Sequence, residues 1–198
     1  MLPGEAAIIQ QLFEAGLECF HLRKLEVEEQ AIRELLDAIP AEYHPRIALH
    51  RYHHLAHEYN IQRLHFSESH RWNVDETLWW PLREKGYMFS TSVHELTTLN
   101  SISMLFSYTF FSPVFDSISK QQYRGVTTEG FYLHTERKRV PVIALGGIDE
   151  SNIKRVAAMN FDGAAVLGTI WNEPANAVKN FKLLQKVGLL QKGGSPSR

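Results

Sequence analysis

The sequence contains little cysteine, no long apolar run and no excess of charge of one sign. A single cysteine, Cys19, excludes an internal disulfide bond and is typical of a reducing compartment. No run approaches the roughly 18 apolar residues of a membrane-spanning helix, and no basic segment followed by an apolar core marks a secretory signal. The net charge of −1 argues against a broad nucleic-acid surface. We therefore predict a soluble cytoplasmic protein that binds neither membranes nor nucleic acids.

The composition that is present is that of a globular protein. The chain has 198 residues, of which 44% are hydrophobic and 22% charged, enough for one domain with a substantial core. The last residues read KGGSPSR, a composition typical of flexible termini. We predict a single domain over residues 1–191 and a flexible tail at 192–198.

Short apolar segments alternate with amphipathic segments along the whole chain. The apolar segments predict strands at 17–22, 46–50, 63–66, 87–92, 105–111, 141–145 and 163–168. Helical spacing of apolar residues predicts helices at 28–39, 75–85, 151–159 and 176–188. This alternation implies parallel strands joined by crossovers. A (β/α)₈ barrel and an open flavodoxin-like sheet both fit, and the small and β-branched strand residues favour the barrel.

An eight-stranded barrel needs one strand more than the pattern supplies. The chain opens with a turn and a helix whose apolar stripe is Ile8, Ile9, Leu12 and Phe13. A strand would have to precede Pro3. We therefore predict a TIM barrel that lacks its first strand or is truncated there, with an opening between the strands at 17–22 and 163–168.

Polar side chains follow the strands at their carboxyl ends, where ligands bind in parallel α/β folds. Arg23 follows the first strand and would face an anion or, equally well, a carboxylate of a neighbouring loop. Ser92 and His94 follow the fourth strand with the same parity. A histidine there can move protons near neutral pH, although a solvated histidine at a helix start would look the same.

Residues suited to an anion follow the last three strands. Ser117, Ser119 and Lys120 supply two hydroxyls and an ammonium group, as an ordinary polar loop also would. Gly147 and Gly168 allow backbone N–H groups to approach a ligand closely. Loops after the last two barrel strands commonly hold phosphate. We predict a phosphate site here.

The paired glycines, Gly146 and Gly147, suggest that something outside the chain lies close to this backbone, because a tight turn needs at most one. Asp149 is predicted to cap the helix that follows.

Histidines are concentrated in one part of the chain, seven of the ten lying between His44 and His70. His53 and His57 have the i, i+4 spacing of zinc ligands, but no cysteine, acid pair or H-E-x-x-H motif completes such a site. We predict no metal site.

Five motifs, in this order and spacing, together resemble the thiamine phosphate synthase/TenI family: FHLRK, STSVHE, SPVFDSISKQ, VIALGGIDESNI and DGAAVLGTI. The resemblance covers nearly the whole chain after residue 5. It implies a (β/α)₈ barrel that handles a thiazole phosphate in thiamine biosynthesis.

The resemblance implies one of two activities. The synthase joins a pyrimidine diphosphate to the thiazole phosphate with magnesium on the leaving diphosphate, whereas TenI-type proteins are metal-free thiazole tautomerases. Where the synthase has Gln-Leu-Arg, this chain has His21, Leu22 and Arg23. Where the synthase has Asn-Asp, whose aspartate binds magnesium, this chain has His50 and Arg51. A second magnesium-binding aspartate corresponds to His70. Because both carboxylates are missing, the resemblance is closer to the TenI branch.

By this resemblance the acid/base is His94, and the substrate-binding residues are Arg23, His50, Ser92, Ser117, Ser119, Lys120, Gly147, Leu167 and Gly168. The predicted function is a thiazole tautomerase without a cofactor. The first alternative is a synthase in which Mg²⁺ would be the cofactor or in which Arg23, Arg51 and Lys120 replace it. The second is a non-catalytic regulator that binds a thiazole phosphate. The expected partner is a small phosphorylated thiazole, and a homo-oligomer is possible.

Overall fold

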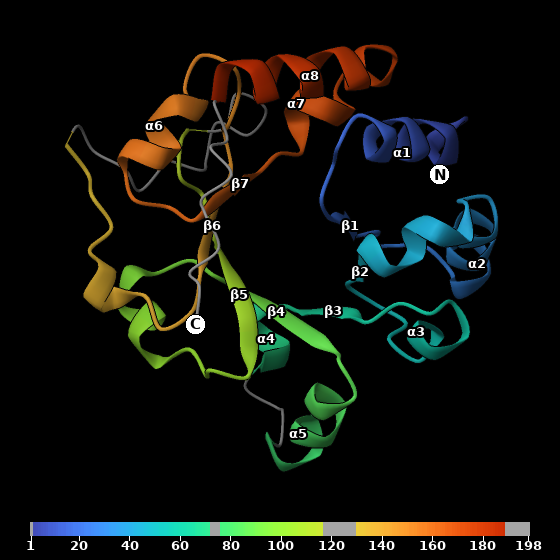
Figure 1. Ribbon diagram of the computed structural model, residues 1–198, viewed down its shortest axis with the longest axis horizontal. Coiled ribbons are helices and arrows are strands. Elements are labelled where there is room, and N and C mark those ends of the chain that lie inside the picture. Colours follow the sequence, from blue (N-terminus) through green and yellow to red (C-terminus); the bar gives the residue numbers. More distant parts are fainter. Residues whose placement is uncertain (1, 72–75, 117–129, 189–198) are drawn as a thin grey trace.

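A curved parallel sheet with helices on its outer side forms the computed structural model, which describes residues 2–71, 76–116 and 130–188 (Figure 1). Its strands are β1 (Phe20–Leu22), β2 (Ile47–Leu49), β3 (Arg63–Phe66), β4 (Met88–Val93), β5 (Phe106–Phe111), β6 (Val142–Leu145) and β7 (Gly163–Ala165). All seven predicted strands are therefore confirmed: β3 has the predicted bounds, β4 is shifted by one residue, and the other five are shorter than predicted. The predicted tail at 192–198 lies outside the described residues.

The strands lie in the sheet in their order along the chain, from β1 to β7, and every neighbouring pair is parallel. A flavodoxin-like sheet reverses its strand order at a switch point, so this sequential order excludes that alternative. The prediction of an α/β barrel that lacks one strand is confirmed in the described residues. The strands β1 and β7 form the two edges.

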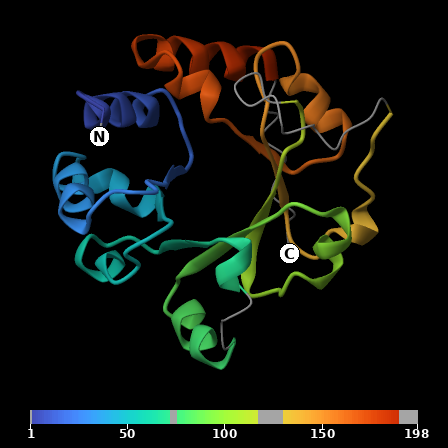
Figure 2. The same ribbon diagram turned by 180° about the vertical axis from the view of Figure 1, so that it is seen from behind.

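Helices cover the convex side of the sheet, except for one short helix over 68–71, which lies against the end of β4 (Figures 1 and 2). They are α1 (Glu5–Glu14), α2 (Glu29–Asp37), α3 (Leu55–Glu58), α4 (Glu68–Arg71), α5 (Glu76–Glu84), α6 (Ile153–Ala158), α7 (Gly168–Trp171) and α8 (Ala177–Gly188). Short 3₁₀ segments lie at 41–46, 96–101, 135–137 and 174–176. No described helix has the length and apolar character needed to cross a bilayer.

Alternation along the strands separates an apolar outer layer from a polar inner one. On β4, Phe89 and Val93 are buried, and the ring of Phe89 lies 4.8 Å from that of Trp79 on α5. The alternate residues Ser90 and Ser92 instead hydrogen-bond to His65 on β3. The hydrophobic core therefore lies between sheet and helices, and the inside of the barrel is free to carry polar chemistry.

Side chains and helices, not strand pairing, join the two edges of the sheet. The ring of Phe20 on β1 meets that of Trp171 on α7 edge to face, with centroids 6.2 Å apart. Helix α1 packs against α8, and Gln185 Nε2 donates a hydrogen bond to the Ala15 carbonyl at 3.2 Å. These contacts hold β1 and β7 in one curved unit.

The predicted cap of α6 is wrong in detail. The residue before the first helical residue is Asn152, not Asp149. The Asp149 carboxylate accepts hydrogen bonds from the backbone N–H and the hydroxyl of Ser151, and its carbonyl accepts one from the Ile153 N–H. A turn over 149–152 therefore precedes the helix, so that its cap lies three residues later than predicted.

Candidate active site inside the barrel

Three histidines from three consecutive strands meet inside the barrel. His21 lies on β1, His50 directly follows β2, and His65 lies on β3. The register of the sheet places them side by side, because Leu22 pairs with Leu49 and Leu49 with Leu64. One ring nitrogen from each histidine lies within 4.8 Å of the others.

Direct contacts connect this histidine cluster (His21, His50 and His65). His21 Nδ1 and His50 Nε2 are hydrogen-bonded at 2.9 Å. The rings of His50 and His65 stack with centroids 3.9 Å apart and planes inclined by 22°. The ring of Phe110 on β5 packs against His21 and His65, at 4.6 and 5.4 Å. Packing therefore holds all three imidazoles in place.

Hydroxyl groups surround the cluster. His21 Nε2 is 2.7 Å from the phenol oxygen of Tyr108, which lies 4.0 Å from Cys19 Sγ. His65 is hydrogen-bonded through Nδ1 to Ser90 at 2.9 Å and through Nε2 to Ser92 at 3.1 Å. Every hydroxyl can donate or accept, so both nitrogens of His21 and of His65 keep a hydrogen-bond partner in either tautomer.

Burial keeps the three imidazoles neutral. It lowers the pKa of His21 to about 3, assisted by the positive charge of Arg63, and that of His65 to about 2, with a smaller contribution from His21. The pKa of His50 is lowered in the same direction, first by burial and then by His65. Burial also raises the pKa of the Tyr108 phenol. At neutral pH the cluster therefore offers lone pairs and hydroxyl protons, not positive charge.

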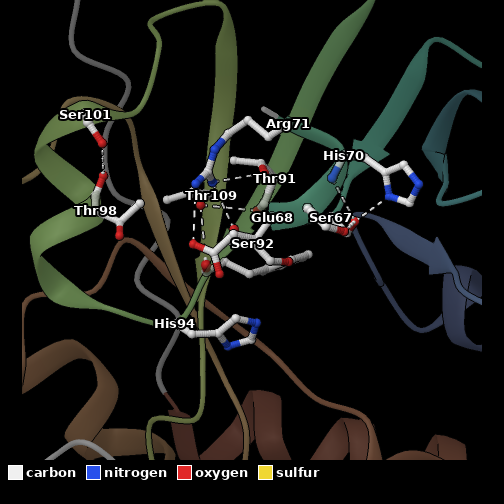
Figure 3. Close-up of polar contacts among 12 residues, drawn as sticks. Ser67, Glu68, His70, Arg71, Thr91, Ser92, His94, Thr98, Ser101 and Thr109 are labelled. Atoms are coloured by element: carbon white, nitrogen blue, oxygen red, sulfur yellow. Dashed lines mark hydrogen bonds and ion pairs between the residues drawn. The ribbon is translucent and has the colours of Figure 1, made fainter. Parts of the chain in front are cut away.

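The predicted acid/base, His94, lies one residue beyond β4 and is exposed (Figure 3). Its Nδ1 is 2.9 Å from the carbonyl oxygen of Ser112, after β5. A carbonyl can only accept, so Nδ1 carries the proton and donates it. Nε2 is then the nitrogen with the free lone pair, which suits a base.

Arg71 fixes the carboxyl end of β4 next to this histidine (Figure 3). Its guanidinium donates to the Ser92 carbonyl at 3.0 Å and to the Thr91 hydroxyl at 3.4 Å, and pairs with Glu68 at 3.4 Å. An arginine in this structural position was not predicted from the sequence.

Two other predicted binding residues, Arg23 and His50, lie at the same end of the barrel but differ in charge and exposure. Arg23 is exposed just beyond β1, and its charge helps to lower the pKa values of His50 and His65. It therefore lies at the same end of the barrel as the cluster. His50 belongs to the cluster itself and is neutral, so it offers a hydrogen bond to a substrate but no charge.

The glycine pair after β6 is required by the chain's own backbone. Gly147 has φ +65°, and a Cβ there would lie 2.6 Å from the Asp116 carbonyl oxygen and 2.7 Å from that of Phe115. A Cβ on Gly146, at φ +100°, would lie 3.0 Å from Pro113 Cα. The sequence correctly indicated a close approach, and the atoms that approach these glycines in the structure belong to the loop after β5.

The residues predicted to bind phosphate after β6 and β7 come together. Leu167 is 64% exposed, and Gly168 begins α7. The Thr169 hydroxyl donates a hydrogen bond of 2.6 Å to the carbonyl of Ile148, which joins this loop to the one that contains Gly147. Ser117, Ser119 and Lys120 lie outside the described residues.

The two residues at the expected magnesium positions do not fit that ion. Arg51 donates to the carbonyl of Leu25, and the His70 Nδ1 is 2.6 Å from the Ser67 hydroxyl. Neither side chain offers the oxygen ligands that magnesium prefers. We derive no step of the chemistry through magnesium at these positions.

Comparison with known proteins decides the family. A family model described as thiamine monophosphate synthase matches residues 4–170. The chain belongs to this family. The predicted resemblance is thereby confirmed, and with it the barrel fold.

Curated relatives of the chain carry the name thiamine-phosphate synthase. One from Hydrogenobaculum sp. (strain Y04AAS1) is 32% identical over 101 residues, which are 50% of this chain and 47% of the relative. One from Pyrococcus abyssi is 35% identical over 57 residues, or 29% of this chain and 28% of the relative. The matched segments thus span half or less of these relatives.

Solved structures extend the similarity to nearly the whole chain. A thiamine phosphate pyrophosphorylase from Bacteroides thetaiotaomicron has a TM-score of 0.75 and 28% identity, covering 96% of this chain and 94% of that one. A second from Pyrococcus furiosus has a TM-score of 0.74 at 17% identity, covering 93% and 89%, and supports the fold alone.

Sequence reasoning missed the histidine cluster, although a signal for it was present. His21, His50 and His65 are each the last or the second-last residue of a predicted strand, on strands that follow one another. The pair with zinc-like spacing, His53 and His57, is not part of the cluster. His53 Nε2 instead contacts the Leu49 carbonyl at 3.0 Å, and the His57 side chain is exposed.

Proposed function

We propose that the chain performs thiamine-phosphate synthase chemistry, joining a pyrimidine diphosphate to a thiazole phosphate at the carboxyl ends of the strands. The observation that carries the proposal is family membership over residues 4–170, supported by the similarity to a thiamine phosphate pyrophosphorylase over 96% of the chain. The sequence favoured the tautomerase, and these comparisons favour the synthase instead.

The chain's own residues offer a partition of the two substrates. The joined loops after β6 and β7, with Gly147 and Gly168, suit the thiazole phosphate. Arg23 and Arg51 follow β1 and β2 and suit the diphosphate, whose charge needs cations where magnesium ligands are lacking. The neutral histidine cluster between them suits hydrogen bonding to an uncharged ring.

The first prediction concerns Arg51. Replacing it with alanine removes a cation from the proposed diphosphate site, so we expect kcat/KM for the pyrimidine diphosphate to fall about 10- to 100-fold, as for a lost charge-assisted hydrogen bond. Thiamine phosphate formation from both substrates would be measured with and without Mg²⁺. Arg137→Ala, an exposed arginine in the 3₁₀ segment before β6, is the control and should keep full activity. Absence of product from the unaltered chain under both conditions would refute synthase chemistry.

A thiazole tautomerase is the second candidate, and the geometry of His94 favours it. Its Nδ1 is committed to the Ser112 carbonyl, so Nε2 is available as a base beside the proposed phosphate loops. The tautomerase is also favoured because the two expected magnesium positions are occupied by Arg51 and His70, which have no carboxylate. A tautomerase needs a base and a phosphate site but no metal.

We expect His94→Ala to lower the rate of thiazole tautomerisation by about 10²- to 10⁴-fold, because general acid–base catalysis contributes that much. The rate would be followed by NMR of the thiazole ring in the presence of EDTA. His134→Ala, another exposed histidine, should leave the rate unchanged. Tautomerisation at full rate in the His94 variant would contradict the assignment. Thiazole phosphate binding without turnover in either assay would support the non-catalytic alternative.

A further inference from the structure

We propose that His21, His50 and His65 bind one divalent metal ion of the zinc class inside the barrel. The proposal does not rest on the proposed function, but it replaces the substrate hydrogen bond given to the cluster there, because a bound metal takes one lone pair from each ring. It rests on the arrangement of three ring nitrogens, on the groups that surround them, and on the type of ligand.

The three ring nitrogens already converge. They lie within 4.8 Å of one another, and His21 Nδ1 and His50 Nε2 are 2.9 Å apart. Tetrahedral zinc with Zn–N bonds of about 2.0–2.1 Å requires ligand nitrogens about 3.3 Å apart. Binding therefore needs a nitrogen to move by up to about 1.5 Å. It also needs the stacked rings of His50 and His65 to rotate apart, so that their lone pairs point to one ion.

In His21 and His65, the ring nitrogen that would face away from the metal is hydrogen-bonded to an oxygen atom. With His21 Nδ1 on the metal, Nε2–H donates to the Tyr108 oxygen at 2.7 Å. With either nitrogen of His65 on the metal, the other donates to Ser90 or Ser92. Such outer hydrogen bonds fix the tautomer and orientation of metal-binding histidines.

The donor set selects the ion. Three neutral imidazoles suit zinc and its first-row neighbours and do not suit magnesium, which prefers oxygen. Three protein ligands also leave the fourth tetrahedral position open, as in catalytic zinc sites. His21 and His50 are only partly buried, whereas His65 is 3% exposed.

The test is a titration of the untagged, full-length chain with Co²⁺ after removal of metals by a chelator. We expect one Co²⁺ per chain, the strong visible absorption of four-coordinate cobalt, and displacement by Zn²⁺. His50→Asn and His65→Gln should each weaken binding about 100-fold or more, and Ser92→Ala about 10- to 100-fold. His53→Gln and His57→Gln, a histidine pair outside the cluster, are the matched controls and should bind normally.

The readouts do not depend on activity, so they stay decisive if the proposed enzyme function fails. Binding weaker than millimolar, a six-coordinate cobalt spectrum, or binding that survives the cluster substitutions would each overturn the proposal and leave a hydrogen-bonded cluster without metal. If a cluster variant does not fold, zinc X-ray absorption spectroscopy of the unaltered chain replaces it. Three imidazole ligands would support the site, and any other ligand set would overturn it.

Discussion

Replacing Gly147 with alanine is expected to lower the free energy of unfolding by about 3 kcal/mol. The left-handed backbone at φ +65° costs a non-glycine residue about 1 kcal/mol or more. The added Cβ would also lie 2.6 and 2.7 Å from two carbonyl oxygens of the loop after β5. Backbone atoms cannot move aside as a flexible side chain can, so this loop would be displaced. Urea unfolding followed by circular dichroism measures the loss.

Gly4→Ala separates the two contributions. Gly4 has a similar φ of +72°, but a Cβ there meets nothing within 4 Å, so only the backbone cost of about 1 kcal/mol should remain. Equal losses in the two variants would show that the contact with residues 115 and 116 is not the reason for the glycine. Phosphate binding would then regain its place as the explanation for the pair.

The metal-free protein is expected to lose stability steeply between pH 6.5 and about pH 4. Burial holds the pKa of His21 at about 3 and that of His65 at about 2, and lowers that of His50 in the same direction. In the unfolded chain each titrates near 6.5, so below that pH the unfolded state binds more protons. At pH 5.5 each neutral histidine costs about 1.4 kcal/mol, and the three together about 3 kcal/mol once the partial exposure of two is allowed for.

Urea unfolding in EDTA at pH 7.5 and 5.5 tests this expectation. Because the folded pKa values are lowered, stability is fully present above pH 6.5 and is lost as the pH falls. His65→Gln keeps a hydrogen-bonding side chain but removes one titrating group, so the difference between the two pH values should shrink by about 1 kcal/mol. A His57→Gln control, at an exposed position, should leave the difference unchanged. An identical pH dependence in all three proteins would contradict the assignment to the cluster.

Much of the fold could be predicted because each strand carries its own local signal. The seven apolar segments were placed correctly, since alternation and turn residues act within a few residues of the chain. The position of His94 just after β4 and the meeting of the loops after β6 and β7 follow from the rule that the carboxyl ends of parallel strands lie at one edge of the sheet. The late start of α6 was missed because Asp149 satisfies a turn just as well as a helix end.

The histidine cluster and the partner of the glycine pair could not be predicted, because both depend on contacts between segments that are distant in the sequence. His21 and His50 are 29 positions apart in the chain, and only the register of β1 against β2 determines that their rings touch. The glycine pair was interpreted as a ligand site because the sequence around it does not indicate that residues 113–116 pass close to it. Close approach was predictable there, but its partner was not.

The contact of α1 with α8 has a consequence for how the chain folds. Every strand pairs with its neighbour in the sequence, so the sheet grows by closing short loops, each with a small entropic cost. The hydrogen bond from Gln185 to Ala15 instead joins residues 170 positions apart. The entropic cost of bringing these two residues together falls once the strands β1 to β7 have formed, because the flexible chain between the two residues is then shorter. We therefore expect α1 and α8 to meet late in folding and their contact to be among the first to open, which native-state hydrogen exchange would show.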